Sequence, residues 1–263
     1  MCKLLLIEKH SPASRDALIL KTWAYFAASG EKDGFGAMWI SKSGKLAFAK
    51  SSHPDLTNNI PAFVEGFNEN CETDEPSNGG WLMIHGRRAT CDINTENTHP
   101  MITNSLSAGL VHNGVVDSDL YTCTNSTCDS ELLLHAMTSH GIDGLRDITG
   151  YFAFGMLQKA KNGWVARIAR DDQARLRVGS LKGGYAFGTT DEALAICGAK
   201  VIGDFKKNTV LTYNANGTTK LEPLVKGYKV YTKFAQKELD DKWLKASEFS
   251  YGKSTKGYLS AND

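Results

Sequence analysis

Short apolar runs separated by polar turns make up most of this chain. The first run, Leu4–Ile7, has no polar position among its members, which is typical of a strand buried on both faces. A longer apolar stripe through Leu20–Ala27 continues until Gly30, and Ser11-Pro12 supplies a start signal ahead of it. The pattern therefore predicts a buried first strand followed by a helix of about four turns.

Most of the remaining runs have the length and composition of strands. The runs at 35–41 and 45–51 flank Ser43-Gly44, which predicts a hairpin. Further strands are predicted at 80–87, 107–116, 151–158, 163–171, 183–190 and 208–214, and helices at 128–141 and 190–199. Thr189, with Glu192 three residues later, predicts a capping box at the last helix. Many strands, few helices and hairpin-like connections predict a mainly antiparallel α+β protein.

No internal repeat and no linker divides the chain. We therefore expect one domain over residues 1–226, with the charged, lysine-rich segment 227–263 as a C-terminal extension of it. The longest surface loop is predicted at 68–80.

Composition and charge narrow the class of protein. Lys plus Arg number 30 against 29 Asp plus Glu, so the chain has no overall field to attract nucleic acid or an anionic membrane. No apolar run reaches the length of a membrane span or a secretory signal. Six cysteines, at 2, 71, 91, 123, 128 and 197, show no paired metal-binding spacing. We expect free thiols in the reducing cytoplasm, and no metal.

Cys2 has two explanations. As part of the first strand it would be an ordinary buried thiol. If Met1 is removed, however, Cys2 carries both a thiol and the α-amine of the chain. A nucleophile activated by its own amino terminus is a known catalytic arrangement. The position alone leaves both explanations open.

Four later stretches add polar candidates, namely His85-Gly86-Arg87, Asn97-Thr98-His99-Pro100, His112-Asn113-Gly114 and Asp129. Taken singly, each has a structural explanation, such as a charge at a strand end, a tight turn or a helix N-cap. Together with Cys2, and in this order, they resemble the class II glutamine amidotransferases, whose glutaminase domains are N-terminal nucleophile hydrolases. The resemblance covers residues 2–225 and includes the segments 32–36 and 187–195.

The resemblance implies a fold and a reaction. The fold would be the four-layer αββα sandwich of N-terminal nucleophile hydrolases. The Cys2 thiol would attack the side-chain amide of L-glutamine, with the α-amine exchanging protons, to give glutamate and ammonia through a γ-glutamyl thioester. The Asn113 amide and the Gly114 backbone N–H would stabilise the oxyanion. No cofactor is implied.

The resemblance also implies how the amino-acid end of the substrate is held. Arg87 would bind the α-carboxylate and Asp129 the α-ammonium, with Thr90 as a further polar contact. His99 is placed with the substrate-binding residues. For His99 and His112, both a catalytic and a structural role stay open. The polar loop 91–98 is expected to fold over bound substrate.

Some positions depart from the common pattern. Lys3 follows the cysteine where most family members have glycine, and Arg88 and Cys91 replace an aromatic residue and a histidine common in the sugar-aminating branch. The start of the chain looks closer to the stand-alone branch that includes the ergothioneine-pathway γ-glutamyl hydrolase. A glutaminase with an ammonia-accepting synthase on a separate chain is expected. A hydrolase of a larger γ-glutamyl compound and a catalytically silent binding subunit remain alternatives.

Overall fold

Two antiparallel sheets form the centre of the protein, in a computed structural model that describes residues 2–8, 15–52 and 80–224. The first sheet has the strand order β11-β9-β10-β1-β4-β2-β3 and the second β13-β12-β8-β7-β6-β5. The strands of the first sheet are β1 (Lys3–Ile7), β2 (Gly34–Ile40), β3 (Leu46–Ser51), β4 (Leu82–Arg87), β9 (Arg177–Leu181), β10 (Gly184–Gly188) and β11 (Lys200–Asp204). Those of the second are β5 (Met101–Ile102), β6 (Ala108–Asp117), β7 (Thr149–Ala160), β8 (Gly163–Arg170), β12 (Thr209–Tyr213) and β13 (Thr219–Pro223).

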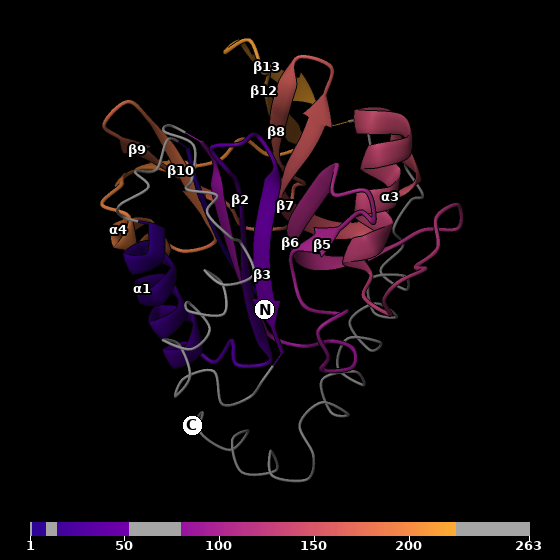
Figure 1. Ribbon diagram of the computed structural model, residues 1–263, viewed down its shortest axis with the longest axis horizontal. Helices are drawn as coiled ribbons and strands as arrows, with labels where there is room; N and C mark the ends of the chain where they lie inside the picture. The colour runs from indigo at the N-terminus through magenta and orange to yellow at the C-terminus, as the bar shows by residue number, and fades with distance from the viewer. Residues whose placement is uncertain (1, 9–14, 53–79, 225–263) are drawn as a thin grey trace, which may run out of the picture.

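Helices cover the outer face of each sheet (Figure 1). Helices α1 (Arg15–Ala28) and α4 (Asp191–Ile196) lie on the first sheet, and α3 (Ser130–His140), followed by the 3-10 helix η2 (Gly141–Asp147), lies on the second. The layers therefore run helix, sheet, sheet, helix, which confirms the predicted α+β sandwich of type αββα.

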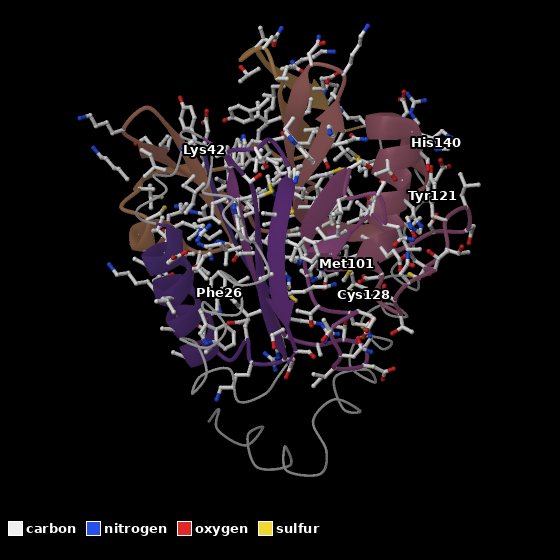
Figure 2. All side chains as sticks on the ribbon, in the orientation of Figure 1. Phe26, Lys42, Met101, Tyr121, Cys128 and His140 are labelled. Carbon is white, nitrogen blue, oxygen red and sulfur yellow. The ribbon has the colours of Figure 1, made fainter. Side chains whose placement is uncertain are left out.

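The burial of β1 explains its unbroken apolar run. Leu5 and Ile7 pack into the cluster beneath α1 and α4, where Phe26 of α1 also lies (Figure 2). Leu4 and Leu6 point the other way, into the cluster between the two sheets. Because β1 is central in its sheet and covered on both faces, every side chain of Leu4–Ile7 is buried and no polar position interrupts the run.

The predicted capping box is wrong. Thr190, not Thr189, is the N-cap of α4, and its Oγ1 accepts a hydrogen bond from the backbone N–H of Ala193 at 3.2 Å. Thr189 binds β1 instead, because its Oγ1 accepts a hydrogen bond from the backbone N–H of Leu4 at 3.2 Å. The helix is also shorter than predicted, because Gly198 has a left-handed φ of 74°.

Three predictions lie outside the described residues, namely the helix start at Ser11-Pro12, nearly all of the loop at 68–80, and the extension 227–263. The helix predicted to follow Ser11-Pro12 is α1. It ends where predicted, just before Gly30, whose φ is 96°. Within the described ranges, no helix has the length and apolar character needed to cross a membrane.

Candidate active site

Cys2 stands at the end of the first sheet where β1 begins. Lys3 pairs with Gly86 of β4, so Cys2 lies beside the residues that follow this strand. Its Sγ is 3.4 Å from the backbone nitrogen of Arg88, which donates to it, and 3.5 Å from the Arg88 carbonyl oxygen. Lys3 fixes this end of the chain through a largely buried ion pair with Glu31, Nζ to Oε2 2.6 Å. The backbone of Arg88 and the Lys3–Glu31 ion pair therefore hold this end of the chain in place.

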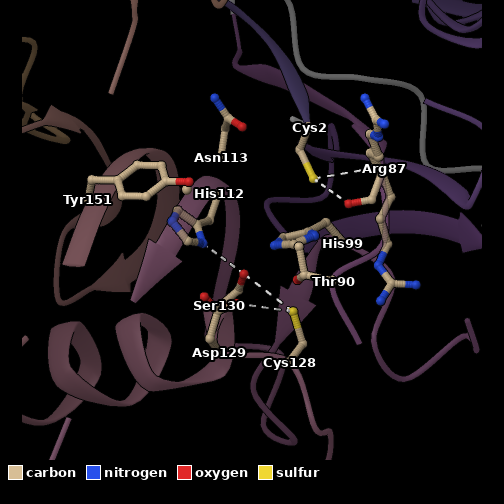
Figure 3. Close-up of a pocket in the computed structure, with 12 residues that line it drawn as sticks. Cys2, Arg87, Thr90, His99, His112, Asn113, Cys128, Asp129, Ser130 and Tyr151 are labelled. Carbon is tan, nitrogen blue, oxygen red and sulfur yellow. Dashed lines mark hydrogen bonds between the residues drawn. The ribbon is translucent and has the colours of Figure 1, made fainter. Parts of the chain in front are cut away.

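The second sheet brings Asn113 and Gly114 of β6 to the same place (Figure 3). A Cβ on Gly114 would lie 2.1 Å from the carbonyl oxygen of Tyr151, and its φ is 152°, so only glycine fits there. Asn113 is buried, and its Oδ1 has no hydrogen-bond partner among the described residues. An unpaired buried amide oxygen costs about 1 to 3 kcal/mol. The Asn113 side-chain amide thus has an unused hydrogen-bonding atom at the pocket. Rotation of this amide by half a turn would exchange Oδ1 for the N–H donors of Nδ2.

Arg87 ends β4 and is 2% exposed. Its Nη2 donates to the carbonyl oxygens of Cys91 at 3.1 Å and Asp92 at 3.0 Å. Its Nη1 is buried and has no partner within the part of the chain that the structure describes. One half of the guanidinium therefore holds the loop that starts at Cys91, and the other half is available to an anion.

Asp129 occupies the N-cap position of α3, but its side chain does not cap the helix. Its Oδ2 accepts instead from the backbone N–H of Val116, at 2.7 Å, which ties it to β6. The pocket beside it is lined by Cys2, Arg87, Arg88, Thr90, His99, His112, Asn113, Gly114, Cys128, Asp129, Ser130 and Tyr151. This pocket is therefore lined by all seven residues predicted from the sequence to act in catalysis or binding, namely Cys2, Arg87, Thr90, His99, Asn113, Gly114 and Asp129. Its volume of about 20 Å³ has room for little more than a water molecule, so a ligand the size of an amino acid requires it to open.

The segment that precedes Asp129, residues 121–126, lies along α3 and is joined to it by hydrogen bonds. Tyr121 hydrogen-bonds His140 at the far end of the helix, Oη to Nδ1 2.9 Å (Figure 2), and His135 Nδ1 lies 2.9 Å from the Thr122 carbonyl oxygen. Nearer the pocket, the Glu131 carboxylate accepts hydrogen bonds from the 124–126 turn, including both the N–H and the hydroxyl of Ser126. Burial opposes ionisation of Glu131, but these hydrogen bonds outweigh it and lower its pKa to about 2.

Three buried histidines pack between the pocket and the core. The rings of His85 and His99 are 3.9 Å apart between centroids, and His85 Nε2 lies 3.0 Å from the carbonyl oxygen of His112. His112 Nδ1 hydrogen-bonds Ser130 Oγ at 2.8 Å. Burial lowers the pKa of all three, that of His85 to about 3 and that of His99 well below its usual value. All three are therefore neutral near pH 7, which favours a structural role over general-acid catalysis.

These histidines predict a pH dependence of stability. A histidine whose pKa is lower in the folded than in the unfolded chain stabilises the fold above the unfolded pKa of about 6.5, and this contribution is lost as the pH falls. We expect the free energy of unfolding to fall between about pH 6.5 and pH 4, by about 1.4 kcal/mol per pH unit for each such histidine. Urea titrations at several pH values measure this slope. His99→Gln should reduce it, and an unchanged slope would contradict the assignment.

The thiol of Cys2 is protonated in the resting site. Burial raises its pKa, while the Arg88 backbone N–H and the Arg87 charge act against burial without outweighing it. Attack on an amide therefore requires a base that removes this proton. Within the described residues, no cluster of three His, Cys, Asp or Glu side chains is placed to bind a metal ion.

Sequence reasoning missed several residues that shape the pocket. Cys128 and Ser130, on either side of Asp129, and Tyr151 of β7 line it, although none of the three had a predicted role. The segment 32–36 also helps to hold the pocket wall, because Asp33 Oδ2 accepts a hydrogen bond from the backbone N–H of Ala89 at 2.7 Å. A Cβ on Gly36 would lie 2.1 Å from the His99 carbonyl oxygen, which explains the glycine in this segment.

Comparison with known protein families matches residues 73–225, more than half of the chain, to the glutamine amidotransferase domain. The match includes the motifs at Arg87, His99, Asn113 and Asp129 and begins after Cys2. Comparison with curated proteins found no match.

Solved structures share the fold. One is glutamine phosphoribosylpyrophosphate (PRPP) amidotransferase from B. subtilis complexed with ADP and GMP, with a TM-score of 0.62 and 17% identity. Another is described as the allosteric regulatory enzyme of purine biosynthesis, with a TM-score of 0.61 and 16% identity. Each match covers 85% of this chain but only 49% of the other, so the chain spans about half the length of these proteins. The likeness confirms a sandwich of the N-terminal nucleophile hydrolase type.

Proposed function

The chain belongs to the glutamine amidotransferase family, and from that premise we propose that it hydrolyses the side-chain amide of L-glutamine through a γ-glutamyl thioester on Cys2. The products are glutamate and ammonia. The observation that carries the proposal is the meeting, at one pocket, of a thiol and Arg87 from the first sheet with Asn113, Gly114 and Asp129 from the second sheet and α3.

In the proposed first step, Cys2 Sγ attacks the amide carbon of glutamine. Met1 is removed in the mature enzyme, so the α-amine of Cys2 takes the thiol proton and passes it to the leaving ammonia. A reference pKa of about 7.7 to 8.0 suits the amine to this exchange near neutral pH. Water then attacks the thioester and releases glutamate.

The oxyanion formed in both steps would lie between Asn113 and Gly114. The Asn113 side-chain amide supports this role, because it lies at the pocket with Oδ1 unpaired among the described residues and, rotated by half a turn, directs its N–H donors at the substrate oxygen. One such donor contributes roughly 2.7 to 4 kcal/mol to lowering the barrier.

The amino-acid end of glutamine would be held by Arg87 and Asp129, with Thr90 and His99 in the pocket wall. The buried, unpartnered Nη1 of Arg87 is the donor available to the α-carboxylate. Asp129 is held at the pocket by the hydrogen bond from the Val116 N–H, and its carboxylate would pair with the α-ammonium. Together these two groups select a free amino acid rather than an internal residue of a peptide.

The test is a comparison of substrates. Purified chain is given L-glutamine, a γ-glutamyl dipeptide and a γ-glutamyl thioether compound, and the release of glutamate is measured. We expect the highest kcat/KM with glutamine. Preference for a larger γ-glutamyl compound would identify the stand-alone hydrolase, and no turnover of any of them with Met1 removed would identify a silent subunit.

We also propose a separate ammonia-accepting synthase as partner, because free ammonia would otherwise be lost to solvent. Its binding should raise kcat/KM for glutamine in the mature chain. Fast hydrolysis by the isolated chain, unaffected by any candidate synthase, would contradict this part of the proposal.

The loop 91–98 is predicted to close over the substrate. In the empty site its base is held by Arg87 and by the buried Asn97, whose Nδ2 donates to the Asp92 carbonyl oxygen and to Thr127 Oγ1. Residues 92, 93, 95 and 96 between these anchors are exposed. We expect their amide hydrogens to exchange fast without ligand and more slowly with a non-hydrolysable glutamine analogue.

Hydrogen exchange followed by mass spectrometry measures this difference. The turn at 214–217, far from the pocket between β12 and β13, serves as the internal control and should not change. Equal protection of 91–98 with and without the analogue would contradict a closing loop.

A further inference from the structure

Two cysteines that the proposed mechanism does not use, Cys91 and Cys128, contact the residues proposed to hold the substrate. Arg87 Nη2 donates to Cys91 Sγ at 3.1 Å. Cys128 lines the pocket (Figure 3), with its Sγ 3.6 Å from Asp129 Oδ1 and 3.5 Å from Ser130 Oγ. One thiol therefore stands on the carboxylate-binding side of the pocket and the other on the ammonium-binding side.

Both thiols also belong to one packed cluster. Cys128 is buried in the core between the second sheet and α3, and the half-buried Cys91 packs against the same core. Asn97 strengthens this junction, because its Oδ1 accepts from the backbone N–H of Thr127, next to Cys128. The start of the 91–98 loop is thus fastened beside the start of α3.

The surroundings of Cys91 and Cys128 shift the pKa values of the two thiols in opposite directions. A hydrogen bond with the Cys128 thiol, together with the Arg87 guanidinium, lowers the pKa of Cys91 in spite of burial. The same contact and burial raise the pKa of Cys128 well above its usual value. Of the two thiols, Cys91 is therefore the one that ionises more readily, and Cys128 is the one that keeps its proton. A thiolate beside a thiol is the arrangement that thiol–disulfide exchange uses.

We propose that Cys91 and Cys128 form a reversible disulfide bond across the substrate clamp. The oxidant is a small-molecule disulfide such as oxidised glutathione. The Cys91 thiolate attacks one of its sulfurs, the S–S bond breaks, and one glutathione thiolate leaves. The Cys128 sulfur, losing its proton to solvent, then attacks the Cys91 sulfur of the mixed disulfide and releases the second glutathione. Two protein thiols are oxidised and one small disulfide is reduced to two thiols.

The bond would close the pocket. It would take Cys91 Sγ away from Arg87 and fasten the 91–98 loop covalently to the residue preceding Asp129. The loop could then no longer open to admit glutamine. This consequence for activity rests on the proposed function, whereas formation of the bond does not.

The test is made in the full chain carrying Cys2→Ala, so that the catalytic thiol cannot react. The reduced protein is incubated with oxidised glutathione, quenched with acid, alkylated and digested with trypsin. Cyanogen bromide then cleaves after Met101, which separates Cys91 from Cys128. We expect a peptide containing Cys91 disulfide-linked to one containing Cys128, and a protein lighter by two hydrogen atoms.

Variants assign the two roles. With Cys128→Ser the reaction should stop at one glutathione on Cys91, whereas Cys91→Ser should show neither the adduct nor the link. Cys123→Ser is the matched control, because Cys123 packs against the same core and should leave the link intact. Oxidation at other cysteines with Cys91 and Cys128 unmodified would overturn the proposal, as would a link between Cys91 and Cys123.

Activity is measured separately, in the chain with Cys2 present. Oxidised glutathione should lower glutamine hydrolysis at least tenfold, with recovery on reduction, and Cys91→Ser should remove this sensitivity. A link that forms without loss of hydrolysis would overturn the closing of the pocket. A reduced chain that hydrolyses no glutamine at all would contradict the proposed function, and the mass measurement would still decide on the disulfide.

Discussion

Replacing Cys2 with alanine should lower glutamine hydrolysis by about 10⁴-fold or more, because the other thiol that lines the pocket, Cys128, has a raised pKa and no terminal amine beside it to take its proton. The fold should be retained, since among the described residues the Cys2 thiol makes only two long hydrogen bonds, both with the backbone of Arg88. Steady-state kinetics measure the loss, and thermal unfolding checks the fold. Cys2→Ser should also lose most activity, because a hydroxyl is much less acidic than a thiol and the terminal amine is too weak a base to ionise it.

The control for this variant is Cys197→Ala. Cys197 follows α4 on the outer side of the first sheet and its Sγ contacts only the Leu194 carbonyl oxygen among the hydrogen bonds described. Its removal should leave kcat/KM within about twofold. Substantial residual activity in Cys2→Ala would remove Cys2 from the role of nucleophile.

Replacing Arg87 with lysine should lower kcat/KM for glutamine by about 10- to 100-fold, mainly through KM. A hydrogen bond to a charged group contributes roughly 1.5 to 3 kcal/mol, and an ammonium cannot supply the planar fork. The single nitrogen of lysine also cannot occupy both the position of Nη2, which binds the Cys91 and Asp92 carbonyl oxygens, and that of Nη1, which is assigned to the substrate. The loop that these bonds hold should therefore loosen as well.

Arg88→Lys is the matched control. Arg88 is the next residue, its side chain is exposed, and it contacts Cys2 only through its backbone. Its replacement should change KM little. Asp129→Asn should act like Arg87→Lys, because asparagine keeps an acceptor for the Val116 N–H but loses the charge that would pair with the substrate ammonium. Unchanged KM in both Arg87→Lys and Asp129→Asn would contradict the assigned clamp.

The central strands could be predicted from sequence because their side chains face a core. β1, β4, β6 and β7 carry long buried runs, and all four lie within two residues of their predicted bounds. The strands β5, β9, β11 and β13 were not predicted. β11 and β13 are edge strands whose residues are mostly half-buried or exposed, and they pair through backbone hydrogen bonds that leave no hydrophobic pattern.

The candidate site could be predicted only in part. Order and identity of the motifs indicated Cys2, Arg87, Asn113 and Asp129, but no pattern shows that segments from two different sheets meet. That depends on strand register and on the packing of one sheet against the other. For the same reason the sequence could not show that Arg87 also holds the 91–98 loop, or that Cys128 lies in the pocket wall.

The proposed mechanism passes through a covalent intermediate on an amino-terminal cysteine. The most direct measurement is the intact mass of the purified chain, before and immediately after mixing with glutamine and quenching in acid, followed by mapping of the modified peptide. The proposed mechanism predicts a chain that lacks Met1 and gains one glutamyl group on the peptide that begins with Cys2. A chain that retains Met1 yet hydrolyses glutamine, or a glutamyl group on any other residue, would contradict it.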